Sequence, residues 1–170
     1  MESILKQKLN KIVPFECEEL RVRPLIYKDA VDYYKYISED EIVNIFQNKN
    51  LKNFQLIDTY IKWIIKEKET KYAVVFKDNN KLIGGLSFYK KNKDDLWVGY
   101  WLGTPFWGKG YIVKVLKETL KHLRLTRIIK VLKAEIPINN KNSFKAAKKA
   151  GFELEKIKGD IYEMRYEFKI

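Results

Sequence analysis

The sequence predicts an α+β domain, with a mixed, mostly antiparallel twisted sheet of about seven strands and helices on both faces. Two observations point to this fold class. Three β runs over residues 72–76, 82–89 and 96–102 follow one another with polar turns between them, as in an antiparallel meander. The strand–helix–strand unit over residues 96–136 has the length of a parallel crossover. The 170 residues are expected to form one domain, 1–170, around a single core.

The segment before the meander is expected to contribute a strand and helices. Its apolar residues alternate with basic ones early on and recur at helical spacing later. The expected elements are a helical or irregular lead-in over 1–19, a half-buried strand over 20–25, a helix capped by Asp29 and running through Ile37, a short helix with a loop over 38–54, and a helix over 55–69.

The segment after the meander begins with a glycine loop and a helix over residues 111–125. Apolar residues of this helix form a predicted core stripe made of Val113, Leu116, Leu120 and Leu123. A strand over 128–136 and a helix between Asn140 and Gly151 follow, because Asn is a good N-cap and Gly suits the left-handed position after a helix. Strict alternation over residues 162–170 predicts a last half-buried strand.

Gly108 and Gly110 lie between the buried strand and the helix that follows it. Glycines let the main chain pass close to a ligand, and the free N–H groups of a helix N-terminus attract anions. This arrangement favours phosphate binding, although most Gly-x-Gly pairs form only tight turns. A dinucleotide fingerprint is excluded because its third glycine would fall at Val113, and no Gly-Lys-Ser/Thr of a P-loop follows.

The positive charge of the chain is concentrated in the segment that carries this loop. Residues 81–150 hold 16 Lys and Arg against 4 Asp and Glu, which equals the net charge of +12 of the whole chain. Such a field favours a polyanionic ligand, an acidic protein or nucleic acid. A solubilising lysine surface is the alternative.

Composition excludes several other classes. No apolar run approaches the ~20 residues of a membrane span, and the first residues lack a signal-peptide core, so a cytoplasmic protein without membrane contact is expected. The single cysteine, Cys17, leaves no internal disulfide. With one histidine, His122, which reads as a solvated helix residue, no metal site is predicted.

Six short motifs occur in order over nearly the whole chain, and together they resemble the GNAT family of acyl-CoA N-acyltransferases. Within that family the chain resembles the ribosomal-protein N-terminal acetyltransferases of the Rim type. The motifs are Leu20-Arg21-Val22-Arg23-Pro24-Leu25 with Asp29, Ile83-Gly84, Gly99-Tyr100-Trp101-Leu102, Phe106-Trp107-Gly108-Lys109-Gly110-Tyr111, Asn140-x-x-Ser143 and Gly151-Phe152.

The resemblance implies acetyl-CoA as co-substrate, no metal, and direct transfer of acetyl to a primary amine. It also implies a splayed central strand pair that admits the pantetheine arm. The implied cofactor-binding residues are Tyr100, Trp101 and Leu102 through the main chain, and Gly108, Lys109, Gly110, Tyr111 and Ile112 through their N–H groups at the pyrophosphate, together with Trp107. Asn140 is implied at pantetheine, and Lys145, Lys109 or Lys114 as charges for the adenosine phosphates. For Asn140, a plain helix cap is an equal alternative.

The chemistry needs a neutral amine, a donor for the oxyanion and stabilisation of the departing thiolate. By resemblance, Ser143 is the candidate for the thiolate; a capping hydroxyl is the alternative. The glutamate that many relatives carry on the central strand is replaced by Trp97, so Glu135 or a water chain remains as base. The tyrosine acid of other branches would fall at Ala147.

These departures bear on the acceptor, the amine that receives the acetyl group. An α-amine with a pKa near 8 is about 10% neutral at pH 7, whereas a lysine amine is under about 0.1% neutral. The missing base therefore favours a protein N-terminus, such as that of an acidic ribosomal protein, over a lysine side chain.

Two other functions remain open. A small polyamine or antibiotic would need an acidic cluster, for which Asp32, Glu39, Asp40 and Glu41 are candidates. A degenerate domain that binds CoA or nucleic acid without turnover is the third hypothesis. Monomer and homodimer are both open, with the last strand as a candidate for pairing across a dimer. Six aromatic residues are expected to lie mostly in the core and partly along the acceptor groove: Tyr33, Tyr34, Phe46, Phe54, Tyr60 and Trp63.

Overall fold

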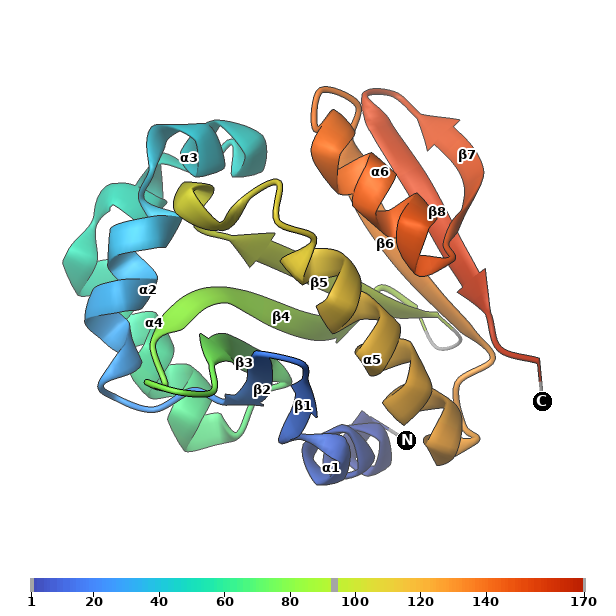
Figure 1. Ribbon diagram of the computed structural model, residues 1–170, viewed down its shortest axis with the longest axis horizontal. Coiled ribbons are helices and arrows are strands. Elements are labelled where there is room, and N and C mark those ends of the chain that lie inside the picture. Colours follow the sequence, from blue (N-terminus) through green and yellow to red (C-terminus); the bar gives the residue numbers. More distant parts are fainter. Residues whose placement is uncertain (1, 93–94, 170) are drawn as a thin grey trace.

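The computed structural model describes residues 2–92 and 95–169 and contains one eight-stranded sheet (Figure 1). The strands are β1 (Phe15–Cys17), β2 (Leu20–Pro24), β3 (Lys71–Phe76), β4 (Leu82–Lys90), β5 (Leu96–Leu102), β6 (Val131–Pro137), β7 (Glu153–Lys158) and β8 (Ile161–Glu167). Their order in the sheet is β1-β2-β3-β4-β5-β6-β8-β7. In the described residues, β5 and β6 pair in parallel and the other neighbours pair antiparallel. The predicted mixed, mostly antiparallel sheet is confirmed.

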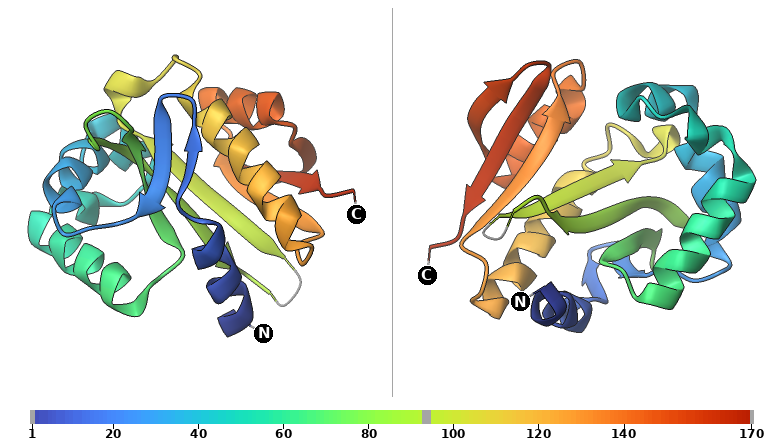
Figure 2. Two further views of the ribbon diagram at one scale, coloured as in Figure 1. Left: turned by 60° about the horizontal axis from the view of Figure 1, so that its bottom comes forward. Right: turned by 180° about the vertical axis from the view of Figure 1, so that it is seen from behind.

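Helices cover both faces of the sheet (Figure 2). They are α1 (Glu2–Ile12), α2 (Asp29–Ile37), α3 (Asp40–Phe46), α4 (Phe54–Glu67), α5 (Tyr111–Thr126) and α6 (Lys141–Ala150), with short 3₁₀ turns over Lys49–Lys52 and Thr104–Phe106. One hydrophobic core lies between the sheet and α1, α5 and α6. A second lies between the sheet and α2, α3 and α4. Helices on both faces were predicted, and their distribution creates two cores.

Strand β3 shows why the meander is apolar throughout. Its Tyr72 and Val74 belong to the first core, whereas Ala73 and Val75 belong to the second. A strand with helices over both faces buries every side chain, so it reads as a continuous apolar run without alternation. The meander thus forms the partition between the two cores.

The expected helical lead-in is present as α1, but two details of the N-terminal region differ from the prediction. The lead-in also contains the three-residue strand β1, which is too short for alternation to reveal. Asp29 is the first residue of α2 and does not cap it. Instead its buried carboxylate accepts two hydrogen bonds from Arg23, at 2.7 and 2.8 Å, and one from the backbone N–H of Ile26.

Two expectations for the C-terminal half also need correction. On α5 the buried stripe includes Val115, whereas Val113 is half-buried and lines a cavity. Strand β6 begins at Val131, later than predicted, and Ile128 is exposed. Because the first turn of α5 faces the cavity, Val113 points toward the cavity and Val115 takes its place among the core residues of the helix.

The last strand, β8, lies inside the sheet between β6 and β7. The prediction that the last strand pairs across a dimer is therefore wrong, because both of its edges are already used. The hairpin of β7 and β8 inserts the later strand next to β6 and leaves β7 at the edge. In the described part of the chain, no helix combines the length and apolar character needed to cross a membrane.

Candidate active site

Strands β5 and β6 pair over only two residues and then diverge (Figure 1). The paired positions are Leu96 with Leu132 and Trp97 with Lys133. Beyond them β5 stays paired with β4 and β6 with β8, so their facing edges are left without a strand partner. A cavity of about 760 Å³ lies here, lined by both strands, the glycine loop, α3 and α6. The splayed central pair implied by the sequence resemblance is present.

The glycine loop forms one end of this cavity. Gly108 and Gly110 have φ angles of 72° and 76°, which L-amino acids with a side chain rarely adopt. A Cβ on either residue would meet no protein atom within 4 Å, so backbone conformation, and not protein packing, requires glycine here. Gly110 is the N-cap of α5, and the following N–H groups of its first turn have no partner within the helix. The loop therefore presents free donors and the positive end of a helix dipole to the cavity.

The three residues expected to bind through their main chain differ in availability. The carbonyl of Trp101 lies beside β4, where a Cβ on Gly84 would approach it to 2.2 Å. The carbonyl of Leu102 accepts a hydrogen bond of 2.7 Å from Nε1 of Trp107. Because alternate residues of a strand direct their main-chain groups to opposite edges, Tyr100 faces the same edge as Leu102. Tyr100 is thus the member of the three whose main-chain groups are best placed for a ligand.

Helix α6 brings its first turn against β5. Oδ1 of Asn140 accepts a hydrogen bond of 3.2 Å from the N–H of Ser143, so the predicted N-cap is confirmed. The cap uses the amide oxygen, which leaves the two N–H groups of Nδ2 as donors at the cavity wall. Capping and ligand binding by Asn140 are therefore compatible.

Ser143 is joined to Tyr100 by two contacts. Its Oγ donates a hydrogen bond to the Tyr100 hydroxyl over 3.0 Å, and that hydroxyl donates to the Ser143 carbonyl over 3.3 Å. Burial raises the pKa of Tyr100 to about 12, so its hydroxyl stays protonated at neutral pH. Sequence reasoning considered Tyr100 only for its main chain. Tyr100 and Ser143 are 43 positions apart in the sequence, so the contact between their side chains becomes visible only once β5 and α6 pack together.

The cavity has further lining residues on α3, β4, β6 and the turn before β8. Its wall includes apolar residues of α3, namely Ile42, Ile45 and Phe46. Tyr89, Glu135 and Asp160 add polar groups. Glu135 forms an ion pair with Lys91, and burial together with the charge of Glu135 raises the pKa of Tyr89 to about 12. Sequence reasoning missed Asp160 and the residues of α3, apart from Phe46, because no local pattern marks them.

Of the six candidate aromatic residues, Phe46 lines the cavity. Tyr33 is buried in the second core, against Trp101. Tyr60 and Trp63 stack on each other along α4. The expectation that most of them lie in the core is wrong. Tyr33 is the buried one, Tyr34 and Tyr60 pack partly buried against the second core, and Phe46, Phe54 and Trp63 are exposed. His122 is partly covered by Phe15, on which its ring stacks.

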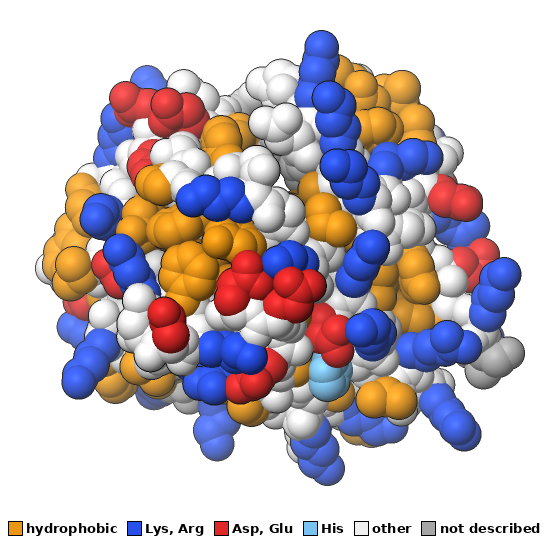
Figure 3. Space-filling view, viewed as in Figure 1, with side chains coloured by type: hydrophobic (Ala, Val, Ile, Leu, Met, Phe, Trp, Pro, Cys, Tyr) orange, Lys and Arg blue, Asp and Glu red, His pale blue; other side chains and the backbone are white. Residues whose placement is uncertain are grey.

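The lysines of the basic segment have different surroundings. Lysines gather over α6, where Figure 3 shows a group of basic side chains, and Lys145 and Lys149 line the cavity. Lys109 is exposed on the glycine loop, outside the cavity wall. Lys114 forms ion pairs with Glu18 and Glu19 at 2.5 and 3.1 Å. Its suggested role at the adenosine phosphates therefore competes with two carboxylates.

Two of the positions that depart from the family pattern, Trp97 and Ala147, are core residues. Trp97 is buried, with the ammonium groups of Lys91 and Lys133 at 4.7 and 5.6 Å from its ring. Ala147 lies on the buried face of α6 itself and is fully buried. Neither position offers a proton-transfer group. Among the described residues, no three His, Cys, Asp or Glu side chains form a group that could hold a metal ion.

The fold and this site define a class: a domain whose parted central strands, glycine loop and helix N-terminus are built for an extended ligand carrying phosphates. The family model described as "Acetyltransferase (GNAT) domain" matches residues 19–153. The chain belongs to this family, and the predicted class, an acyltransferase, is confirmed. The Rim-type branch is not established by this match. No curated protein sequence matches the chain.

Solved structures share the fold at low sequence identity. A GNAT-family acetyltransferase from Bacillus anthracis has a TM-score of 0.82 at 16% identity, covering 91% of this chain and 98% of its own. Ribosomal-protein-S5-alanine acetyltransferase from Vibrio fischeri has a TM-score of 0.72 at 20% identity, covering 92% and 97%. Spermidine N-acetyltransferase from Vibrio cholerae, solved with CoA and spermine, has a TM-score of 0.73 at 17% identity, covering 89% and 96%.

Proposed function

We propose that this protein transfers the acetyl group of acetyl-CoA to the α-amine of a protein N-terminus, with a ribosomal-type protein as the leading acceptor. The observation that carries the proposal is the cavity between β5 and β6. Its wall combines the anion-binding main-chain groups of the glycine loop and the start of α5 with apolar residues of α3 and few acidic groups. The reaction takes place in the cytoplasm, as the sequence predicts.

In this proposal, the chain holds the donor from three sides. The first-turn N–H groups of α5 and the N–H groups of the loop from Gly108 bind the pyrophosphate. The main chain of Tyr100 and the Nδ2 amide of Asn140 bind the pantetheine arm. Lys145 supplies a positive charge for the adenosine phosphates. Lys114 is less suited to this role because it already forms ion pairs with Glu18 and Glu19. The cavity volume is in the range of ligand sites in proteins.

The amine nitrogen of the acceptor attacks the thioester carbonyl carbon, the C–S bond breaks, and one proton passes from nitrogen to the departing sulfur. Ser143 and Tyr100 stabilise the thiolate by hydrogen bonding and do not protonate it fully. A hydroxyl with a pKa of about 12 is too weak an acid to give its proton to a thiolate whose conjugate acid has a pKa near 8.5. The proton that the nitrogen loses after its attack ends on the sulfur and gives the free thiol of CoA.

The acceptor must lose a proton before it attacks. Glu135 is the candidate base that lines the cavity, and one of its two carboxylate oxygens, Oε2, forms an ion pair with Lys91. An α-amine needs less help than a lysine side chain, because a larger fraction of it is neutral at pH 7. This difference favours an N-terminal α-amine as acceptor.

A small polycationic amine is the second candidate, and two of the four acidic residues considered for it are engaged elsewhere. Glu39 accepts a hydrogen bond of 2.7 Å from the N–H of Thr104, and Asp40 is paired with Lys52. At the cavity, Asp160 and Glu135 remain, beside the apolar residues of α3. Two carboxylates suit one cationic amine better than a chain of three or four.

The test is release of free CoA thiol from acetyl-CoA with five acceptors. They are an acidic N-terminal peptide, a basic N-terminal peptide, a lysine peptide with a blocked N-terminus, spermidine and an aminoglycoside. The proposal expects release with a free N-terminus and a mass increase of one acetyl group located there. Release with spermidine or the aminoglycoside and none with either peptide would overturn the N-terminal assignment while leaving the acetyltransferase assignment intact.

Thermal unfolding with and without acetyl-CoA distinguishes the proposed acetyltransferase from the third hypothesis, a binding domain without turnover. A rise in melting temperature together with turnover supports the proposal. A rise in melting temperature with no turnover on any acceptor, ribosomal proteins included, would favour the degenerate domain.

A further inference from the structure

Strand β7 forms an edge of the sheet, and all six of its residues are exposed. The other edge, β1, has only three residues. Natural sheets protect their edges, because unpaired N–H and C=O groups invite another strand, and a very short strand is one such protection. Edge β7 is twice as long and carries two exposed apolar side chains, Leu154 and Ile157, at 40% and 57%. It is therefore the edge at which pairing with another chain is available.

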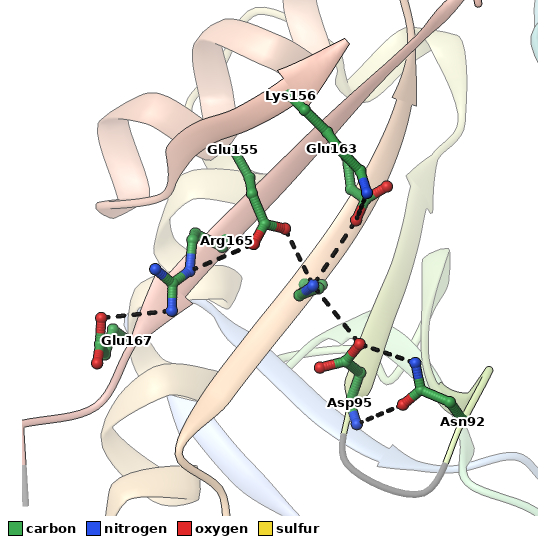
Figure 4. Close-up of polar contacts among 8 residues, drawn as sticks. Asn92, Asp95, Glu155, Lys156, Glu163, Arg165 and Glu167 are labelled. Atoms are coloured by element: carbon green, nitrogen blue, oxygen red, sulfur yellow. Dashed lines mark hydrogen bonds and ion pairs between the residues drawn. The ribbon is translucent and has the colours of Figure 1, made fainter. Parts of the chain in front are cut away.

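The side chains of β7 are sorted between the two faces. Leu154 pairs with Met164 and Ile157 with Tyr162, which places both on the side of the sheet that α6 covers. A bulge between Leu154 and Lys156 leaves Glu155 as an extra residue. Because of this bulge, Glu155 and Lys156 both lie on one face of the sheet, the face opposite to Leu154 and Ile157. There Glu155 contacts Lys133 at 3.0 Å and Lys156 contacts Glu163 at 3.6 Å (Figure 4).

The outer positions of β7 complete the pattern. Glu153 pairs with Arg165 and Lys158 with Ile161 in the register, on the face that carries Glu155 and Lys156. In the part of the chain that the structure describes, neither Glu153 nor Lys158 has an ion-pair partner. The strand thus presents one free acid near its start and one free base at its end.

We propose that β7 pairs antiparallel with β7 of a second copy of this chain about a twofold axis between Glu155 and Lys156. Three kinds of pair then form twice each: Glu153 with Lys158, Leu154 with Ile157, and Glu155 with Lys156. Every pair joins residues of the same face, and both charged pairs join opposite charges. The free acid and free base of one copy meet those of the other.

This register is distinguished from its neighbours by the sequence of the strand. A shift of one or two residues in either direction places Leu154 or Ile157 opposite a charged residue of the other face. Such mismatches cannot pack across an antiparallel pair, because opposed residues must point to the same side. The edge is therefore complementary to itself in one register, as a twofold interface requires.

The test is sedimentation of the full chain over a concentration series from low micromolar to near millimolar. Pairing of one strand from each copy buries an area at the low end of specific interfaces, so the dimer should dissociate on dilution. The variants Glu153→Lys and Lys158→Glu should each raise the dimer dissociation constant about tenfold or more, because symmetry replaces both attractive pairs by repulsive ones. The double variant Glu153→Lys/Lys158→Glu should restore it.

Mixing gives the sharpest outcome. An equimolar mixture of the two single variants should form a heterodimer as stable as the wild-type dimer, because each Lys then faces a Glu. The matched control is Lys66→Glu, which makes the same charge change as Lys158→Glu at a site on α4. It should leave the dissociation constant unchanged.

Three results would overturn the proposal: a wild-type monomer at every concentration, a dimer indifferent to both single variants, or opposite effects of the two variants. Opposite effects of Glu153→Lys and Lys158→Glu would show that dimerisation responds to the net charge of the chain and not to the strand register. Thermal unfolding of each variant confirms that a lost dimer reflects lost pairing and not an unfolded chain. Acetyl transfer is not used as a readout, so the result is independent of the proposed function.

Discussion

The Oγ of Ser143 and the hydroxyl of Tyr100 lie 3.0 Å apart, which joins the first turn of α6 to the middle of β5. These two elements line the cavity between the diverging strands. The pair therefore connects the cap of one element to the ligand-facing edge of the other, and it is the centre of the proposed chemistry.

The first prediction concerns this pair. Ser143→Ala and Tyr100→Phe should each lower kcat on the order of tenfold to a hundredfold, with little change in the KM for acetyl-CoA, because each removes a donor needed as the thiolate departs. The double variant should be little worse than the worse single variant, since the two groups act as a unit. Steady-state kinetics with a thiol reagent measures all three. Unchanged kcat in Ser143→Ala would remove this serine from the mechanism.

The second prediction separates the two roles of Asn140. Asn140→Asp and Asn140→Ser keep an oxygen for the N–H of Ser143 but lose the amide donor, so thermal stability should change little while the KM for acetyl-CoA rises about tenfold. Asn140→Ala loses both and should also reduce the free energy of unfolding by about 1 kcal/mol. If all three variants keep the wild-type KM, the residue is only a helix cap.

The third prediction concerns stability at alkaline pH. Burial raises the pKa of Tyr100 to about 12, above its ordinary value of about 10, so the folded chain favours the neutral hydroxyl. This contribution is complete below about pH 10 and is lost as the pH rises through about 12, up to roughly 2–3 kcal/mol. Tyr60 and Tyr89 also have pKa values of about 12, and they titrate in the same window.

Urea unfolding at about pH 9 and about pH 11.5 measures this loss. The decrease should be smaller in Tyr100→Phe, which has no phenol to ionise. An equal decrease in the variant and the wild type would show that Tyr100 does not have the raised pKa.

The fourth prediction concerns the buried ion pair of Arg23 and Asp29, two hydrogen bonds of 2.7 and 2.8 Å. Arg23→Ala leaves the Asp29 carboxylate buried with its charge uncompensated, so the free energy of unfolding should fall by about 3–5 kcal/mol. Arg21→Ala is the matched control on the same strand. Arg21 pairs with Glu16 at the surface, where the loss should be under about 1 kcal/mol. Chemical denaturation that gave equal losses for the two variants would contradict this account.

The elements that sequence reasoning predicted are those with strong local signals. The apolar run of β3, the Asn140 cap and the left-handed Gly151 after α6 each depend on residues a few positions apart. The glycine loop belongs with them, because the positive φ angles of Gly108 and Gly110 are properties of the local backbone.

The sequence by itself therefore determined the fold class, the order of the main elements and the family. Only the tertiary structure decided that Asp29 binds Arg23, that Lys114 is held by Glu18 and Glu19, that β7 and not β8 is the edge, and that Tyr100 meets Ser143. The physical reason is the range of the interactions. Caps, turns and hydrophobic periodicity act within one element, whereas these four features depend on which distant segments the packed sheet brings together.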